Sequence, residues 1–74
     1  MEVVLHGNLR RLGDRVRVEA KTPREALLAL GVDPEAEEWI LVVGDRVVGL
    51  DERVEGPLEV YPPIAGGWYT EAPA

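Results

Sequence analysis

The sequence predicts a small α+β domain in which one main helix packs on a mixed sheet of four to five strands. Two observations lead to this prediction. Short segments rich in β-branched residues recur along the chain, and glycine, asparagine, aspartate or proline separates them. Only one segment, which begins at Thr22, carries both the start and the stop signals of a helix. A chain of 74 residues leads us to expect a single domain of this kind.

The first two strands are expected to form a hairpin. Residues 2–6 are rich in β-branched side chains, and residues 15–20 alternate strictly between apolar and charged side chains. Turn signals at Gly7 and Gly13 separate the two segments. In the second segment the residues expected to face the core are Val16, Val18 and Ala20, and those expected to face water are Arg15, Arg17 and Glu19.

A helix of about nine residues is expected next. Thr22 is a good N-cap, Pro23 suits the first helical position, and Glu25 completes a capping box. Gly31 is placed to end the helix in the left-handed conformation. The residues that share its apolar face are Ala26, Leu27 and Leu30.

Three further strands are expected, at residues 39–43, 46–48 and 58–61. The last of them ends at two prolines, because proline cannot donate to a ladder. The resulting order is ββαβ(β)β, with the final strand returning to the middle of the sheet. This order predicts a β-grasp (ubiquitin-like) roll, whereas a ferredoxin-like domain would need a second convincing helix.

The composition argues against several classes of function. The net charge is −6, whereas nucleic acids and anionic membranes attract basic surfaces. The chain has no cysteine, and therefore neither a disulfide nor a thiolate nucleophile. It contains no apolar run long enough to span a membrane and no pattern typical of a signal peptide. A cytoplasmic protein without a cofactor is expected.

No arrangement of side chains predicts an enzyme active site. His6 is the only histidine, and we expect it to face solvent or to form a hydrogen bond rather than to bind a metal. A group of acidic residues follows the helix, but its spacing matches no calcium loop, so a solvated face is expected. This group consists of Asp33, Glu35, Glu37 and Glu38, and Trp39, which follows it, is expected to pack beside the helix.

Three stretches of the chain together resemble the MoaD/ThiS family of sulfur carriers, the ubiquitin-like small subunits of molybdopterin synthase and of thiazole formation. Residues 4–10 resemble their opening strand and turn, and residues 46–54 resemble the segment after their third strand. Residues 58–67, Leu-Glu-Val-Tyr-Pro-Pro-Ile-Ala-Gly-Gly, resemble their C-terminal signature. The resemblance implies a β-grasp domain at residues 1–67, followed by a C-terminal tail at residues 68–74.

The resemblance also implies a chemistry and its partners. In the family, a ubiquitin-activating-type adenylyltransferase uses ATP to attach AMP to the terminal glycine carboxylate. Sulfur then replaces AMP, and a sulfur-accepting synthase uses the thiocarboxylate. Carried over to this chain, the reactive residue is Gly67, and the outer sheet face, with Arg15, Arg17 and Glu59, docks the activating enzyme. The other residues expected to contact the partner are Tyr61, Pro62, Pro63, Ile64 and Gly66.

Physical chemistry explains why these residue types suit the C-terminal motif. Gly66 and Gly67 have no Cβ, so this stretch can enter a narrow channel and bring its carbonyl carbon close to a phosphate. Pro62 and Pro63 hold the exit from the sheet extended, which lowers the entropy lost on threading. Ile64 offers an apolar grip. Two neighbouring glycines are also compatible with a flexible joint.

The tail leaves the function open, because Gly67 is amide-bonded to Trp68. In one hypothesis, a processing protease of the JAMM metalloprotease type cuts between these two residues and exposes the carboxylate. In another, the chain is a non-carrier β-grasp binding module with an ordered tail. Residues 7–11 are similar to a stretch in some phage tail-assembly proteins, which favours the module. An intrinsic enzyme is the weakest hypothesis. The pathway also stays open among molybdopterin, thiamine, tRNA thiolation and cysteine synthesis.

Overall fold

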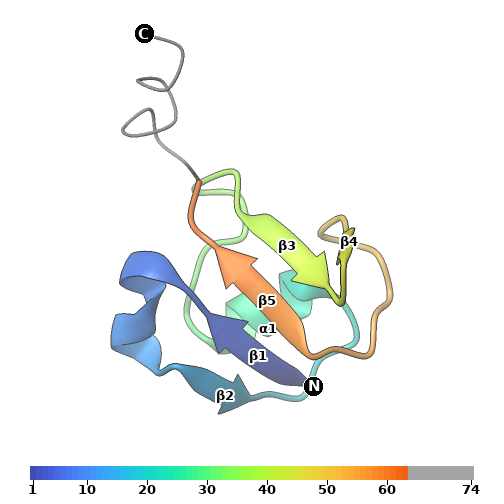
Figure 1. The fold of residues 1–74 in the computed structure, drawn as a ribbon, viewed down its shortest axis with the longest axis horizontal. Helices are drawn as coiled ribbons and strands as arrows, with labels where there is room; N and C mark the ends of the chain where they lie inside the picture. The colour runs from blue at the N-terminus through green and yellow to red at the C-terminus, as the bar shows by residue number, and fades with distance from the viewer. Residues whose placement is uncertain (64–74) are drawn as a thin grey trace, which may run out of the picture.

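One helix lies across one face of a five-stranded sheet in the computed structural model, which describes residues 1–63 (Figure 1). The elements follow the predicted order, with one addition, a 3-10 helix between the first two strands. They are β1 (Glu2–Leu5), η1 (Gly7–Leu12), β2 (Arg15–Arg17), α1 (Pro23–Ala29), β3 (Ile40–Val43), β4 (Arg46–Val47) and β5 (Leu58–Tyr61). The structure is therefore a compact α+β domain with a mixed sheet, as the sequence predicted.

The final strand lies at the centre of the sheet. The strand order is β2-β1-β5-β3-β4, in which β1 and β5 are parallel and all other neighbours are antiparallel. The expected hairpin of the first two strands and the expected return of the last strand to the middle are both confirmed. Because β1 and β5 run in the same direction, the residues that follow them emerge at the same edge of the sheet.

The core lies between the sheet and α1. Val3 and Leu5 of β1 and Leu58 and Val60 of β5 alternate with more exposed residues and are almost completely buried. Leu27 of α1 is also fully buried. The remaining buried apolar residues are Leu9, Ala26, Leu41 and Val48, and those packed against them include Val16, Val18, Ala20 and Leu30. The predicted core faces of the second strand and of the helix are therefore confirmed.

Both ends of α1 follow the sequence signals closely. The Thr22 side chain accepts a hydrogen bond from the Glu25 amide at 3.2 Å. The Glu25 carboxylate accepts from the Lys21 amide at 2.8 Å, one residue before the position that a capping box uses. Gly31 has a φ of +81°, and the amide of Val32 donates to the Leu27 carbonyl at 2.9 Å, which is a Schellman ending.

The connection between β1 and β2 differs from the simple turn that the sequence predicted. Residues 7–12 form a 3-10 helix because Leu9, which is 2% exposed, draws the connection onto the core. The second strand is also shorter than expected. It ends at Arg17, although Val18 still exchanges backbone hydrogen bonds with Met1 at 2.9 and 2.7 Å.

Three other strand boundaries move by one residue. The first strand ends at Leu5 rather than His6. The third strand begins at Ile40 rather than Trp39, because the Trp39 side chain is tied to the preceding loop. The fourth ends at Val47. Val48 turns into the core, where it is 6% exposed, while its amide still donates to the Leu41 carbonyl at 2.9 Å. Within residues 1–63, no helix has the length and apolar character that crossing a membrane requires.

Candidate functional site

The candidate site is the edge of the sheet at which β5 ends. Tyr61 is the last residue of β5 and pairs with Ile40 of β3. Pro62 and Pro63 then leave the sheet and are partly buried. We call residues 61–63 the stalk base, because the Gly-Gly motif follows them in the sequence. The predicted site residues Ile64, Gly66, Gly67 and Trp68, and the expected domain boundary after residue 67, lie outside the described residues.

A cluster of three polar side chains stands at the stalk base. The parallel register pairs Leu5 with Val60 and so brings His6 beside Tyr61. The two rings stack with their centroids 4.1 Å apart and their planes 3° from parallel. His6 Nε2 lies 3.0 Å from Glu59 Oε1, and the Tyr61 hydroxyl donates to the same oxygen at 3.1 Å. His6 is therefore hydrogen-bonded, as expected, but its stacking on Tyr61 has no signal in the sequence.

The hydroxyl of Tyr61 is affected by this arrangement. Its hydrogen bond to the Glu59 carboxylate, together with partial desolvation and the carboxylate charge, raises the pKa of Tyr61 above its ordinary value of 10.0. Deprotonation would remove the donor and place two negative charges side by side. The cluster therefore holds Tyr61 protonated and its ring in one position at the start of the stalk.

The connection after β1 packs directly against the stalk base. Gly7 has a φ of +64°, and a Cβ added there would lie 2.7 Å from Cγ and 3.0 Å from Cδ of Pro62. The adjacent His6 amide donates to the Val60 carbonyl at 3.1 Å. Glycine is required at position 7 for two reasons, the positive φ and the approach of the proline ring. The first resemblance block of the sequence thus contacts the last one.

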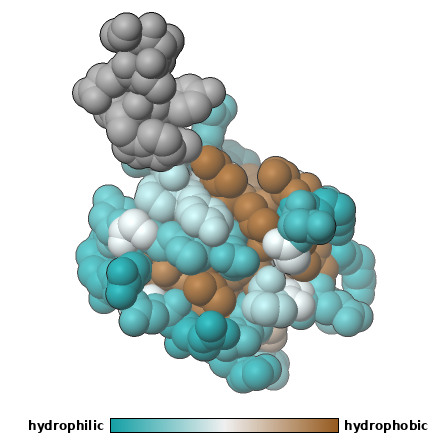
Figure 2. All heavy atoms as spheres, in the orientation of Figure 1, coloured by the Kyte–Doolittle hydropathy of each residue, from teal (hydrophilic) through white to brown (hydrophobic). Residues whose placement is uncertain are grey.

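The outer face of the sheet, on the side away from α1, combines charged and apolar side chains. The register places Arg15, Val4 and Glu59 in one row across β2, β1 and β5. Val42 and Val47 continue the row across β3 and β4. Figure 2 shows hydrophobic side chains gathered over β3 and β4 on this face. Val47 is 70% exposed, so this strip is available to a partner.

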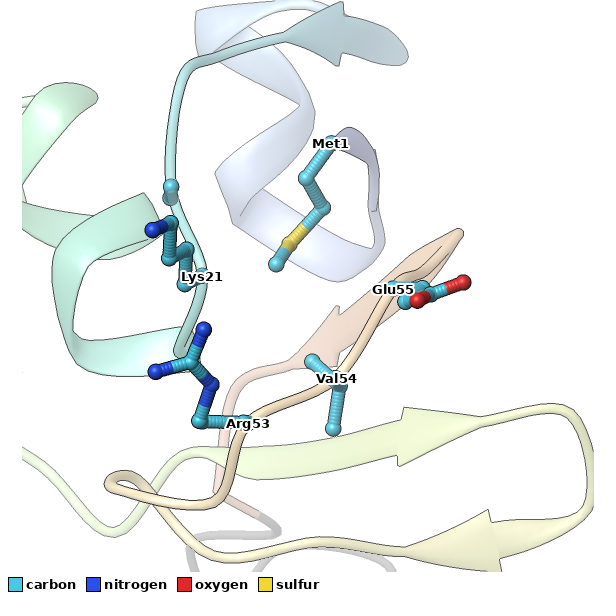
Figure 3. Close-up of a pocket in the computed structure, with 6 residues that line it drawn as sticks. Met1, Lys21, Arg53, Val54 and Glu55 are labelled. Carbon is cyan, nitrogen blue, oxygen red and sulfur yellow. The ribbon is translucent and has the colours of Figure 1, made fainter.

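A hollow lies at the edge of the sheet opposite the stalk base, where β1 and β5 begin (Figure 3). It has a volume of about 400 Å³, and the side chains of Lys21 and Arg53 stand on one side of it. Its wall is completed by Met1, Ala20, Val54 and Glu55. Because β1 and β5 are parallel, this hollow is separated from the stalk base by the length of the strands.

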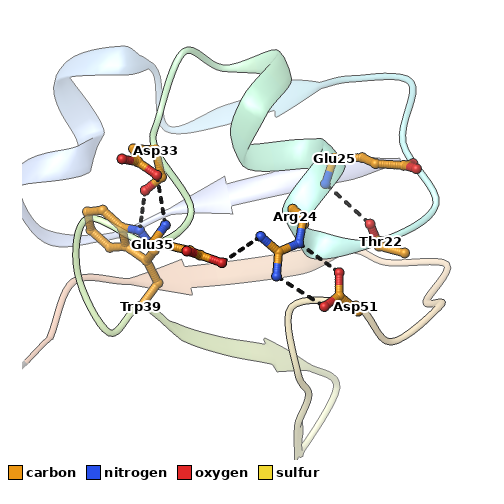
Figure 4. A network of polar contacts seen from close by, with 7 residues as sticks. All are labelled: Thr22, Arg24, Glu25, Asp33, Glu35, Trp39 and Asp51. Atoms are coloured by element: carbon orange, nitrogen blue, oxygen red, sulfur yellow. Dashed lines mark hydrogen bonds and ion pairs between the residues drawn. The ribbon is translucent and has the colours of Figure 1, made fainter.

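A smaller notch borders the stalk base itself. It has a volume of about 170 Å³ and is lined by Asn8, Glu37, Trp39, Pro62 and Pro63. The Trp39 indole N–H donates to the Asp33 carbonyl at 3.0 Å, which ties the indole to the loop between α1 and β3 (Figure 4). Trp39 is packed partly against the core, and it is also one of the residues that line the notch.

The loop that carries Trp39 is anchored to α1 by an arginine network (Figure 4). Arg24 donates to both carboxylate oxygens of Asp51, at 2.7 and 3.1 Å, and to Glu35 at 3.0 Å. These contacts lower the pKa of Asp51 and raise that of Arg24. The acidic group that was predicted to be a solvated face is exposed. One of its members, Glu35, forms an ion pair with Arg24.

The residues of the stalk base and the side chains stacked or bonded to them are partly exposed. Among the described residues no polar or charged side chain is buried, and no three potential metal ligands come together. The sequence analysis selected Tyr61, Pro62 and Pro63 as site residues but not their neighbours Gly7, Asn8 and Trp39.

Comparisons with known protein families, with curated proteins and with solved structures found no match to this chain.

Proposed function

We propose that this chain is a sulfur carrier of the MoaD/ThiS type with a β-grasp fold. In this proposal a protease removes the tail between Gly67 and Trp68. A ubiquitin-activating-type adenylyltransferase then uses ATP to adenylate the Gly67 carboxylate, sulfur replaces AMP, and a sulfur-accepting synthase takes the sulfur from the thiocarboxylate. The chain itself is not an enzyme and needs no cofactor. It acts in the cytoplasm and contacts neither nucleic acid nor membrane, in keeping with its net charge of −6.

The observation that carries the proposal is the position of the stalk base. The central strand β5 ends at Tyr61 and is followed by Pro62 and Pro63, and in the sequence only Ile64 and Ala65 separate these prolines from the Gly-Gly motif. The strand order β2-β1-β5-β3-β4, with α1 on one face, supports a β-grasp assignment. A rigid sheet would then present a narrow glycine pair at a fixed edge, which is the geometry that threading into an ATP-containing channel requires.

The outer sheet face supports a docking role for the body of the domain. Arg15 lies on this face in the same row as Glu59, and Val42 and Val47 add an apolar strip. An exposed apolar strip beside charged side chains is compatible with a protein–protein interface. In the proposal, this face binds the adenylyltransferase while the stalk enters its active site.

Two experiments test the proposal. Mass spectrometry of the protein from its native cells is expected to find chains that end at Gly67, in part as the thiocarboxylate. A chain truncated after Gly67 is expected to support ATP–pyrophosphate exchange by the adenylyltransferase of the same cells. Gly67→Ala in the truncated chain should reduce the exchange and leave the fold unchanged. An unchanged exchange rate in this variant would overturn the carrier function.

A second candidate function is a non-carrier binding module that keeps its tail. The exposed Val47 on the outer face favours it, because such a strip can bind a partner whether or not the Gly-Gly motif is ever freed. The same mass measurement separates the two functions. If only intact chains that end at Ala74 occur in the native cells, the module is the better description.

A further inference from the structure

The notch beside the stalk base has the chemistry of a site for a positively charged side chain. Three residues that line it have polar or aromatic side chains: Glu37 carries a carboxylate, Trp39 an indole and Asn8 an amide. An indole attracts a cation through its π-electrons, and a nearby carboxylate adds a direct charge attraction. The prolines that complete the notch belong to the stalk, so an occupant would contact the stalk directly.

The charge of Glu37 is not neutralised by any ion pair within residues 1–63. The five arginine–carboxylate pairs and the His6–Glu59 contact of this part of the chain use other carboxylates. Arg11 lies close to Asn8 in sequence, but its guanidinium donates to the Asn8 carbonyl at 3.0 Å and does not line the notch. The described residues therefore leave Glu37 available to a cation from elsewhere.

The residues that follow the stalk base in the sequence offer no cation for the notch. Residues 64–74 contain no lysine, arginine or histidine, so the tail of the same chain cannot supply it. The volume of about 170 Å³ suits a single side chain rather than a peptide segment. A planar guanidinium can stack on an indole and donate to a carboxylate at the same time, which an ammonium group does less well.

We propose that this notch binds one arginine side chain of the protein that grips the C-terminal stalk. The identity of that protein rests on the proposed function, whereas the recognition of a guanidinium at the notch can be measured without it. The arginine would lie between Trp39 and Glu37 and against Pro62. It would thus contact the body of the domain and the stalk at the same time. It would position the stalk and take no part in the chemistry at Gly67.

The test is a titration of the full ¹⁵N-labelled chain, followed by NMR, with the peptide acetyl-Gly-Arg-Gly-amide. The control peptide carries citrulline, which has the shape of arginine without its charge. The reporter is the Trp39 indole N–H, which is assigned with the help of the Trp68→Phe variant. We expect a saturable shift with the arginine peptide and binding at least about threefold weaker with the citrulline peptide.

Two exposed neighbours provide matched variants. Glu37→Gln should weaken binding of the arginine peptide at least about threefold, because the direct charge attraction is lost. Glu38→Gln removes the same charge one residue further on, from a side chain that does not line the notch, and should leave binding nearly unchanged. Equal binding of both peptides, an equal loss in both variants, or no shift of the Trp39 indole would each overturn the proposal.

The outcome is independent of the carrier chemistry. A chain whose notch binds arginine can still fail to support ATP–pyrophosphate exchange, which would contradict the proposed function alone. A chain that supports the exchange without binding the arginine peptide would contradict only the proposal that the notch binds arginine.

Discussion

Gly7 and Pro62 approach so closely that no side chain fits between them. A Cβ on Gly7 would lie 2.7 Å from Cγ of Pro62, an atom of a ring that is fixed to the backbone. The contact joins the connection after β1 to the first residue beyond β5, which are far apart in the sequence. It therefore sets the direction in which the stalk base leaves the sheet.

Gly7→Ala is expected to destabilise the domain more than Gly44→Ala does. The two glycines have nearly equal φ values, +64° and +66°, so both variants pay roughly 1–2 kcal/mol for a left-handed alanine. Gly44 has open space around it, whereas alanine at position 7 must displace Pro62, which adds roughly 1–3 kcal/mol. Urea unfolding of both variants measures the difference. Equal losses in the free energy of unfolding would mean that Pro62 can move aside at no cost in stability.

Tyr61 is expected to titrate above its ordinary value of 10.0 because its hydroxyl donates to the Glu59 carboxylate. Since the pKa is raised in the folded state, the stability that this hydrogen bond adds is present below pH 10.0 and is lost as the pH rises through the folded value. Ultraviolet absorbance of the Tyr69→Phe variant isolates Tyr61. Adding Glu59→Gln should lower its midpoint toward the ordinary value, and an unmoved midpoint would contradict the assigned cause.

Acid is expected to destabilise the domain through its arginine–carboxylate pairs. Hydrogen bonds from arginine lower the pKa of four exposed or partly exposed carboxylates, namely Glu2, Asp14, Asp51 and Glu52. A lowered folded pKa means that the stabilisation is complete above the ordinary values of 4.5 for glutamate and 3.8 for aspartate. It is lost as the pH falls through the lower folded values.

The measurement for this prediction is the urea midpoint between neutral pH and the acid range. The midpoint should be flat above the ordinary carboxylate values and should fall below them. Because these pairs are exposed, 1 M salt should reduce the fall. Asp51→Asn, which removes the bidentate partner of Arg24, should reduce it as well. A fall that neither salt nor this variant changes would point to another cause.

Leu27→Ala and Leu28→Ala should differ sharply although both lie in α1. Leu27 is fully buried and Leu28 is 58% exposed. The first variant is expected to lose roughly 2–5 kcal/mol, because it leaves a cavity in the core. That loss is a large share of the roughly 4–11 kcal/mol that a domain of this size has in total. The second should change stability by less than about 0.5 kcal/mol. Thermal or urea unfolding followed by circular dichroism measures both.

The helix was predictable because its signals are local. Thr22 caps it and Gly31 ends it through hydrogen bonds to residues only a few positions away. The strands were predictable for a similar reason, since the alternation of apolar and polar side chains along one segment indicates which face is buried. The prediction failed where a contact with another part of the fold intervened. The burial of Leu9 turned an expected loop into η1, and the bond from Trp39 to Asp33 delayed the start of β3.

By itself the sequence determined the five strands and α1, their order, the core residues of the helix and the motif at residues 58–67. These are properties of short segments, in which periodicity and capping act between near neighbours. Only the tertiary structure decided what surrounds the stalk base. The parallel pairing of β1 with β5 places His6 on Tyr61 and Gly7 against Pro62, and the α1–β3 loop brings Trp39 and Glu37 to the same edge. Contacts between segments so distant along the chain depend on strand register and on core packing, which no local pattern encodes.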